Sequence, residues 1–187
     1  MSGLKASVSE PKHGFHVEGY EKIEYDFTFV DGVFDISNVH LADCYKKWGR
    51  VLTVMDKDVY SLYGQEMERY LQHYGLSLKV HKTSIGEKAK TVNTFLSTCN
   101  SMTEFGIIRK EPVLVVGGGL VTDVAGQGFV VFMLPIGLKG LGLIAISSFA
   151  CAAYRRNTNF IRIITTVIGL IDASVSIEVA VNYGRLG

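Results

Sequence analysis

Short apolar runs alternate along this chain with stretches whose apolar residues recur at helical spacing. Four runs predict strands, because each is short and is closed by a polar residue or a glycine; they cover residues 25–30, 50–55, 76–80 and 113–116. Helical spacing predicts three helices, over residues 39–48, 58–74 and 84–105. Gly75 and Gly106 follow the last two and are typical helix ends. Strands that alternate with helices predict an α/β fold, with a mainly parallel sheet flanked by helices.

A run of three glycines follows the last of these strands. Gly117, Gly118 and Gly119 come directly after residues 113–116, and residues 120–125 then predict the start of a further helix. A helix N-terminus presents free N–H groups and the positive end of its dipole, and glycines let a phosphate approach the backbone. A tight turn without a ligand has the same pattern, so the triplet by itself leaves both interpretations open.

Asp56 ends the predicted strand 50–55, at the kind of position where parallel sheets bind nucleotides. A carboxylate there can accept hydrogen bonds from ribose hydroxyls. The usual dinucleotide fingerprint places its glycines on the first strand and the acid about 20 residues later. Here the acid comes first and the glycines come last, which predicts a different nucleotide-binding fold.

Composition and charge narrow the class of protein. A length of 187 residues indicates one domain or one domain with an appendage, and 48% hydrophobic residues allow a sizeable core. The net charge of +1 gives no basic field for nucleic acid. Three widely spaced cysteines predict reduced thiols and a cytoplasmic protein. Residues 1–20 predict a loose polar arm, and residues 1–11 lack the apolar core of a signal peptide.

Several motifs together resemble the sugar phosphate cyclases, the superfamily of 3-dehydroquinate synthase. The residues that carry the resemblance are Asp56, Gly-Glu-Lys-Ala-Lys at 86–90, Gly-Gly-Gly-Leu-Val-Thr-Asp at 117–123, Tyr-Arg-Arg at 154–156, Thr-Thr at 165–166 and Asp-Ala-Ser-Val at 172–175. The sequence of residues 111–126 and 155–162 is similar to that of the branch of enzymes that acts on sedoheptulose 7-phosphate. That branch includes desmethyl-4-deoxygadusol synthase and 2-epi-5-epi-valiolone synthase, and it belongs to mycosporine-type cyclitol biosynthesis.

The resemblance implies the Rossmann-like nucleotide-binding domain of the dehydroquinate synthase fold, over residues 21–187, with NAD and zinc as cofactors. Such enzymes oxidise a sugar-phosphate hydroxyl transiently, eliminate phosphate, return the hydride and close the ring. The positions that match NAD-binding residues are Asp56, Glu87, Lys90, Gly117, Gly118, Gly119, Asp123, Thr165 and Thr166. The positions that match substrate-side residues, our catalytic candidates, are Arg156, Asp172 and Asn182. The implied partners are a small sugar phosphate and a second copy in a homodimer.

Most of these candidates also have a plain structural interpretation. Glu87 lies three residues after Ser84, which is the spacing of a helix capping box. Asp123 can favour the dipole of a helix as an acid in its first turn. Ordinary strand, cap or solvated surface roles remain open for Thr165, Thr166, Arg155 and Arg156.

Residues 127–148 have no counterpart in the family pattern. Without them, Gly126 would join Phe149 within one continuous helix, whereas the segment carries Pro135 and four glycines, which a helix interior resists. Three interpretations stay open: a translated intron or other gene-model error, a true insertion that forms an apolar appendage, and a membrane span. The length suits a bilayer, but Lys139 near the centre disfavours a span.

Further departures concern the chemistry. Glu178 stands where the family carries a lysine that contacts the substrate, and Ile164 stands where proline usually precedes the two threonines. The family's zinc ligands, one glutamate and two histidines, come from a C-terminal helical domain that the 187 residues lack, and His13 with His16 do not form a metal site. We therefore expect an inactive chain. The alternatives are a non-catalytic NAD-binding module, 3-dehydroquinate synthase proper and a membrane-associated protein.

Overall fold

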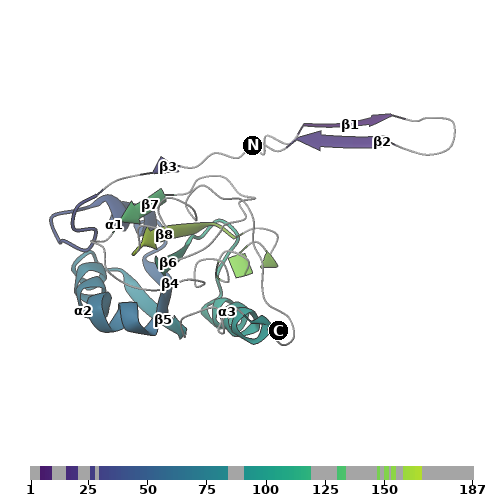
Figure 1. Cartoon of the computed structure of the whole chain (residues 1–187). Coiled ribbons are helices and arrows are strands. Elements are labelled where there is room, and N and C mark those ends of the chain that lie inside the picture. Colours follow the sequence, from purple (N-terminus) through teal and green to yellow (C-terminus); the bar gives the residue numbers. More distant parts are fainter. Residues whose placement is uncertain are drawn as a thin grey trace.

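The main body of the protein is a six-stranded parallel sheet. The computed structural model describes residues 5–9, 16–20, 26–27, 30–83, 91–118, 130–133, 147, 150–151, 153–154 and 158–165. The strands, in spatial order, are β3 (Asp26–Phe27), β7 (Val130–Met133), β8 (Phe160–Ile164), β6 (Val113–Gly117), β4 (Arg50–Asp56) and β5 (Ser77–Thr83) (Figure 1). Every pairing in this sheet is parallel, which confirms the predicted fold class.

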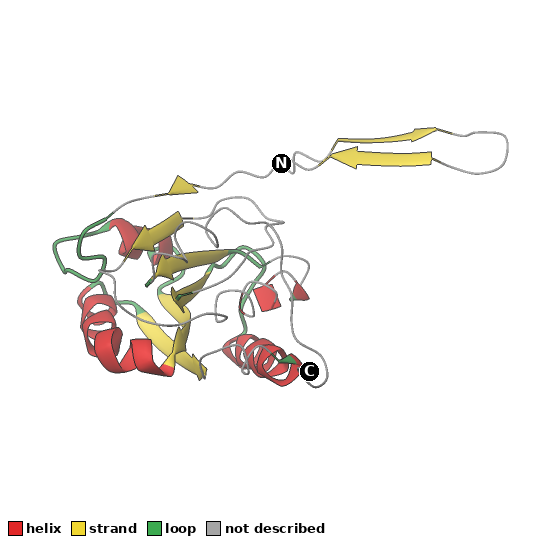
Figure 2. Cartoon of the chain, viewed as in Figure 1, coloured by secondary structure: helices red, strands yellow, loops and turns green. Residues whose placement is uncertain are grey.

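Helices cover both faces of the sheet, because the strands are apolar on both sides (Figure 2). Along β4, Val51 and Met55 pack under α1 (His40–Tyr45) and α2 (Lys57–His73). Leu52 and Val54 point the other way and pack under α3 (Val92–Phe105). The two apolar clusters meet only through the sheet, which explains why the run 50–55 has no alternation of apolar and polar residues.

The predicted glycine ends of α2 and α3 are confirmed. Gly75 has φ 68° and Gly106 has φ 69°, and this left-handed conformation is open to glycine without strain. Beyond Gly75 the N–H of Leu76 donates to the carbonyl oxygen of Leu71 at 2.9 Å, which closes the last turn of α2. Both helices therefore stop where the sequence predicts.

The start of α3 differs from the prediction. We expected this helix to begin at Ser84, with Glu87 completing a capping box. Instead Thr91 is the N-cap, with extended backbone, and its side-chain oxygen accepts from the N–H of Thr94 at 3.3 Å. The capping side chain is thus a threonine that the capping-box pattern did not include, while residues 84–90 lie outside the described residues.

The N-terminal arm is not wholly loose. β1 (Lys5–Ser9) and β2 (His16–Tyr20) form an antiparallel hairpin in which Val8 lies opposite Val17. The short alternation of small apolar and polar residues in β1 favours this pairing, although the overall polarity of residues 1–20 obscures it. Figure 1 shows the hairpin standing away from the six-stranded sheet.

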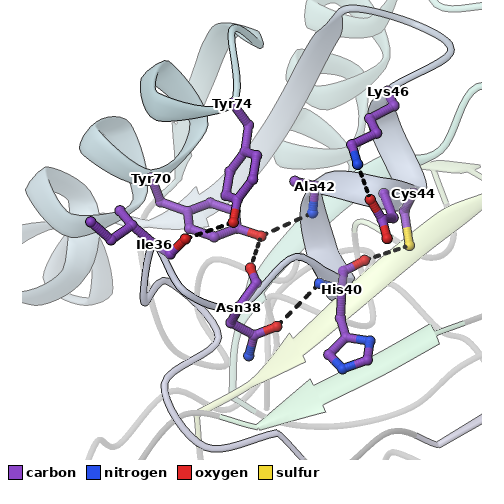
Figure 3. Close-up of polar contacts among 9 residues, drawn as sticks. Ile36, Asn38, His40, Ala42, Cys44, Lys46, Tyr70 and Tyr74 are labelled. Carbon is purple, nitrogen blue, oxygen red and sulfur yellow. Dashed lines mark hydrogen bonds and ion pairs between the residues drawn. The ribbon is translucent and has the colours of Figure 1, made fainter.

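Two tyrosines at the end of α2 hold the segment before α1 (Figure 3). The hydroxyl of Tyr70 accepts from the N–H of Ala42 at 3.0 Å and donates to the carbonyl oxygen of Asn38 at 2.7 Å. The hydroxyl of Tyr74 donates to the carbonyl oxygen of Ile36 at 2.6 Å. Burial raises the pKa of Tyr70 to about 12, so this tyrosine remains a donor at neutral pH.

A bidentate ion pair joins the beginnings of β4 and β6. Arg50 donates through Nε and Nη2 to the two carboxylate oxygens of Glu111, each at 2.8 Å. The same guanidinium donates to the carbonyl oxygens of Phe105 and Gly106 at the end of α3, at 3.0 and 3.1 Å. Glu111 is 1% exposed and also accepts from the N–H of Ile108 at 3.3 Å. One arginine thus satisfies a buried carboxylate and a helix C-terminus together.

Replacing Glu111 should destabilise the fold strongly. Glu111→Ala leaves the N–H of Ile108 without its acceptor. It also removes the bidentate partner of Arg50, which is 38% exposed and keeps its two bonds to the end of α3. We therefore expect a loss of about 2 kcal/mol in the free energy of unfolding. Urea unfolding followed by circular dichroism measures it. The control is Glu104→Ala, which removes an exposed ion pair to Lys79 and should cost under about 1 kcal/mol. Equal losses for the two variants would refute the assigned role of Glu111.

Gly64 makes room for an aromatic ring on the surface of α2. A Cβ atom at this position would meet ring atoms of Tyr60 at 2.7 Å. The ring lies under the ammonium group of Lys82, whose Nζ is 3.3 Å from the ring centroid, and its hydroxyl donates to Glu68. A glycine inside a helix costs about 1 kcal/mol relative to alanine. Here the missing side chain lets Tyr60 lie flat between α2 and β5.

Gly64→Ala should therefore destabilise the protein, although alanine is the better helix former. We expect a net loss of roughly 1 kcal/mol in the free energy of unfolding, because the added methyl group displaces the ring of Tyr60. In a Tyr60→Ala background the clash is gone, and the same substitution should stabilise by up to about 1 kcal/mol. Urea unfolding of the four proteins tests this reversal of sign, and the same sign in both backgrounds would contradict it.

Candidate functional site

The candidate site lies along the carboxyl edge of the sheet, where the register of the strands brings polar residues together. Met55 of β4 is paired with Val116 of β6, so the last residues of the two strands, Asp56 and Gly117, lie side by side. Neighbouring strands are about 4.8 Å apart, which sets the spacing of the two backbones. β6 is paired in turn with β8, where Gly117 lies opposite Ile164 and Thr165 follows. Three of the predicted NAD-binding positions thus share one edge.

The direction of the chain reverses at this edge between β4 and β6. The connection from β4 through α2 leads outward to β5, whereas the connection from β5 through α3 returns across β4 to β6. α2 packs on one face and α3 on the other. Connections that diverge in this way define a topological switch point, which is where open parallel sheets bind ligands. Asp56 and Gly117 are the residues that flank it.

Asp56 has one occupied and one free carboxylate oxygen. Oδ1 accepts from the N–H groups of Asp58 and Val59, at 2.7 and 3.3 Å, and thereby caps α2. Oδ2 is buried and has no hydrogen-bond partner within the described residues. Burial raises the pKa of Asp56, although the two N–H donors act in the opposite direction. A buried acceptor without a partner is costly, and a hydroxyl donor from a ligand would satisfy it.

Thr165 presents a second free oxygen at this edge. Its N–H donates to the carbonyl oxygen of Gly117 at 3.1 Å, which extends the ladder between β6 and β8 by one bond. The side chain is 1% exposed, and its hydroxyl oxygen is buried without a partner in the part of the chain that the structure describes. Gly118, which follows β6, is buried as well. The bare backbone after β6 and two unsatisfied oxygens suit a polyhydroxylated ligand.

Thr83 belongs to the same edge and was not predicted. It ends β5 opposite Asp56 and is 5% exposed. The predicted strand 76–80 stops three residues short of it, because the polar residues His81 and Lys82 mask the end of the strand. The signal that could have found Thr83 is that a polar residue follows a strand. This signal is weak unless the register of the strands is known.

Several predicted site residues cannot be placed. Those outside the described residues are Glu87, Lys90, Gly119, Asp123, Arg156, Thr166, Asp172 and Asn182. In the sequence, Glu87 comes four residues after the end of β5, and Gly119 comes two residues after the end of β6. Two grooves that are lined by described residues lie beside α2.

Part of the segment 127–148 lies in the sheet. Residues 130–133 form β7, which is paired with β8 on one side and β3 on the other. These four residues are therefore part of the sheet, in contrast to one interpretation drawn from the sequence, an insertion that forms an apolar appendage. The sequence Val-Val-Phe-Met is the kind of short apolar run that is typical of strands in parallel sheets.

The described residues also bear on thiols, metal ligands and membrane crossing. The three cysteines are free thiols, as predicted. Across the residues described above, no cluster of three or more potential metal ligands occurs. Among the helices in the same set of residues, none combines the length and the apolar character that a membrane crossing requires.

The fold, the switch point and the sequence define a class of protein. Residues 80–146 match the family model described as 3-dehydroquinate synthase N-terminal. The chain belongs to the 3-dehydroquinate synthase-like sugar phosphate cyclases and contains their N-terminal Rossmann-like domain.

Individual relatives place it more closely within that family. The chain is 47% identical, over its full length, to a demethyl-4-deoxygadusol synthase from Trichormus variabilis. It is 31% identical, over 92% of its length, to a 2-epi-5-epi-valiolone synthase from an Actinomyces species. A solved structure, ValA (2-epi-5-epi-valiolone synthase) from Streptomyces hygroscopicus with NAD+ and Zn2+ bound, matches 90% of the chain with a TM-score of 0.71 and 29% identity. The chain spans 40% of the first of these relatives, 42% of the second and 40% of the solved chain.

Substitutions at Asp56 separate its capping role from the role of its free oxygen. Asp56→Asn retains an oxygen that can cap α2 and removes a buried charge, so the free energy of unfolding at pH 7 should stay the same or rise. Asp56→Ala removes the cap and should cost about 1 kcal/mol.

The pH dependence of this difference is a further part of the test. Because the pKa is raised in the folded state, ionisation of Asp56 opposes folding, and this effect grows as pH rises from the carboxyl's usual range through its folded pKa. The advantage of Asp56→Asn should therefore grow over the same pH window. Urea unfolding between pH 4 and pH 7 measures it, and an advantage that shrinks as pH rises would contradict the assignment.

Proposed function

We propose that this chain is the NAD-binding domain of a sugar phosphate cyclase that acts on sedoheptulose 7-phosphate. The observation that carries the proposal is the buried Oδ2 of Asp56, which lies beside Gly117 at the switch point and has no partner among the described residues. The similarity to a demethyl-4-deoxygadusol synthase and to 2-epi-5-epi-valiolone synthases supports the substrate class. Similarity to 3-dehydroquinate synthases is lower, at 30% identity over 73% of the chain, which makes that activity the second choice.

The residues present fit a dinucleotide. Oδ2 of Asp56 would accept from a ribose hydroxyl, and the backbone of Gly117 and Gly118 would lie beside the pyrophosphate without a side chain in the way. The free hydroxyl of Thr165 adds a polar contact on the side of β8. NAD, when bound, supplies the hydride acceptor for the transient oxidation of the sugar. The protein's part at this edge is to bind the cofactor and to hold its orientation.

The roles of the remaining candidates rest on the family resemblance. We assign Glu87, Lys90, Asp123 and Thr166 to the cofactor, together with Gly119. We assign substrate contacts to Arg156, Asp172 and Asn182. An arginine suits a sugar phosphate because its planar fork can donate two parallel hydrogen bonds to phosphate oxygens.

For the 187 residues by themselves we propose cofactor binding without turnover. Glu178 replaces a lysine that contacts the substrate in the family, and a carboxylate at that position repels a sugar phosphate. This is the function of a non-catalytic NAD-binding module, which is the alternative to cyclase activity for the chain itself. Release of phosphate from sedoheptulose 7-phosphate by the purified chain would decide against it.

Calorimetric titration with NAD tests the proposal on the purified chain. We expect saturable binding, and we expect Asp56→Asn to weaken it by at least about tenfold, because a hydrogen bond to a charged acceptor is lost. Since this variant keeps the cap on α2, unfolding measurements on the same sample show whether the fold is intact. Unchanged affinity in a folded Asp56→Asn variant would refute the role of Asp56. The absence of any binding to the native chain would refute the proposal as a whole.

We also propose that residues 127–148 are an inserted segment. The support is that joining Gly126 to Phe149 restores the sequence pattern of the family. β7 lies in the sheet, so a version that lacks residues 127–148 also loses a strand. If that version binds NAD more tightly than the intact chain, the segment interrupts the site. If it fails to bind while the intact chain binds, the segment is part of the fold.

A further inference from the structure

A groove lies between the segment that precedes α1 and the outer surface of α2. It has a volume of about 380 Å³, which is in the range of small-molecule sites in proteins. One wall is formed by residues of the segment 32–36, and the other by Tyr63, Glu66 and Arg69 of α2. None of these residues belongs to the carboxyl edge of the sheet, so the groove is separate from the candidate cofactor site.

The wall made by residues 32–36 is held in place by contacts with the helix itself. The hydroxyl of Tyr74 donates to the carbonyl oxygen of Ile36 at 2.6 Å (Figure 3). Phe34 is 4% exposed and packs edge-on against Tyr70, with 6.1 Å between the ring centroids. The groove is therefore formed before any ligand arrives, and a ligand does not have to order its walls.

The groove contains one positive and two negative side chains that do not neutralise one another by contact. Glu66 and Arg69 are three residues apart on α2, a spacing at which helical ion pairs usually form. Yet neither has a hydrogen bond or an ion pair within the described residues. Asp35 uses one oxygen, Oδ1, which accepts from the N–H and the hydroxyl of Ser37, each at 2.8 Å. These bonds lower the pKa of Asp35, and the charge of Arg69 acts in the same direction, so the carboxylate is ionised at neutral pH.

The rest of the lining is apolar. Ile36 is 49% exposed, and Phe34 and Tyr63 line the groove beside it. A ligand that satisfies the whole groove thus needs an anionic group, a cationic group and an apolar group. A sugar phosphate or a nucleotide does not fit this description, because its charge would be repelled by two carboxylates. A simple amine would leave Arg69 without a partner.

We propose that this groove binds a free α-amino acid with an apolar side chain. Arg69 pairs with the carboxylate of the ligand, since a guanidinium can donate two parallel hydrogen bonds to it. Glu66 and the second oxygen of Asp35 accept from its ammonium group. The side chain of the ligand packs against Ile36. This site does not rest on the proposed function, because it shares no residue with the candidate cofactor site.

Calorimetric titration of the native chain with leucine and with phenylalanine tests the proposal. We expect saturable binding of at least one of them, with a Kd below about 1 mM. Two analogues of leucine test the role of each charge. Leucinamide lacks the carboxylate and 4-methylpentanoate lacks the ammonium group, and each should bind at least about tenfold more weakly than leucine. If neither amino acid saturates the chain by about 10 mM, or if leucinamide binds as tightly as leucine, the proposal is overturned.

Variants assign the binding to this groove. Arg69→Gln should weaken the binding of leucine at least about tenfold and leave that of leucinamide unchanged, because leucinamide has no carboxylate to lose a partner. Glu66→Gln should weaken leucine and leave 4-methylpentanoate unweakened. The matched control is Arg109→Gln, which removes an exposed arginine outside the groove. Urea unfolding shows whether each variant is folded. Equal losses for Arg69→Gln and Arg109→Gln in folded proteins would overturn the site.

Discussion

The pairing of β4 with β6 is the interaction on which the rest of this structure depends. At the start of the two strands, Arg50 and Glu111 fix their relative position through two parallel hydrogen bonds. At their end, the same register places Asp56 beside Gly117. A shift by one residue would turn every apolar side chain of β4 toward the wrong helix and would separate these two residues. Stability and the candidate site are thus set by one register.

Asp56 connects the site to the helix that follows it. Its first oxygen caps the N-terminus of α2, and α2 in turn holds residues 36–42 through Tyr70 and Tyr74 (Figure 3). Its second oxygen is left buried without a partner among the described residues. Most buried polar atoms in folded proteins are satisfied, so an orphaned acceptor at a switch point indicates a place where a ligand completes the structure. The cost of burying it is the physical sign of a binding role.

Basic side chains on β4 and β5 connect these strands to the helices. On β5, Lys82 lies over the ring of Tyr60 on α2, and Lys79 pairs with Glu104 on α3. On β4, the guanidinium of Arg50 contacts Glu111, just before β6, and the end of α3. These three basic side chains therefore each join a strand to a helix.

The sequence by itself determined the class of fold, the order of its central elements and the edge at which the candidate site lies. Apolar runs, helical spacing and terminal glycines are local signals, and Gly75 and Gly106 ended their helices as predicted because left-handed backbone favours glycine wherever it occurs. Only the tertiary structure decided that α3 begins after Thr91, that Thr83 shares the edge with Asp56, and that residues 130–133 enter the sheet. It alone showed that one oxygen of Asp56 caps α2 and that the other has no partner in the part of the chain that the structure describes. These features depend on register and burial, which bring together residues distant in the chain and leave no signal in any short stretch of sequence.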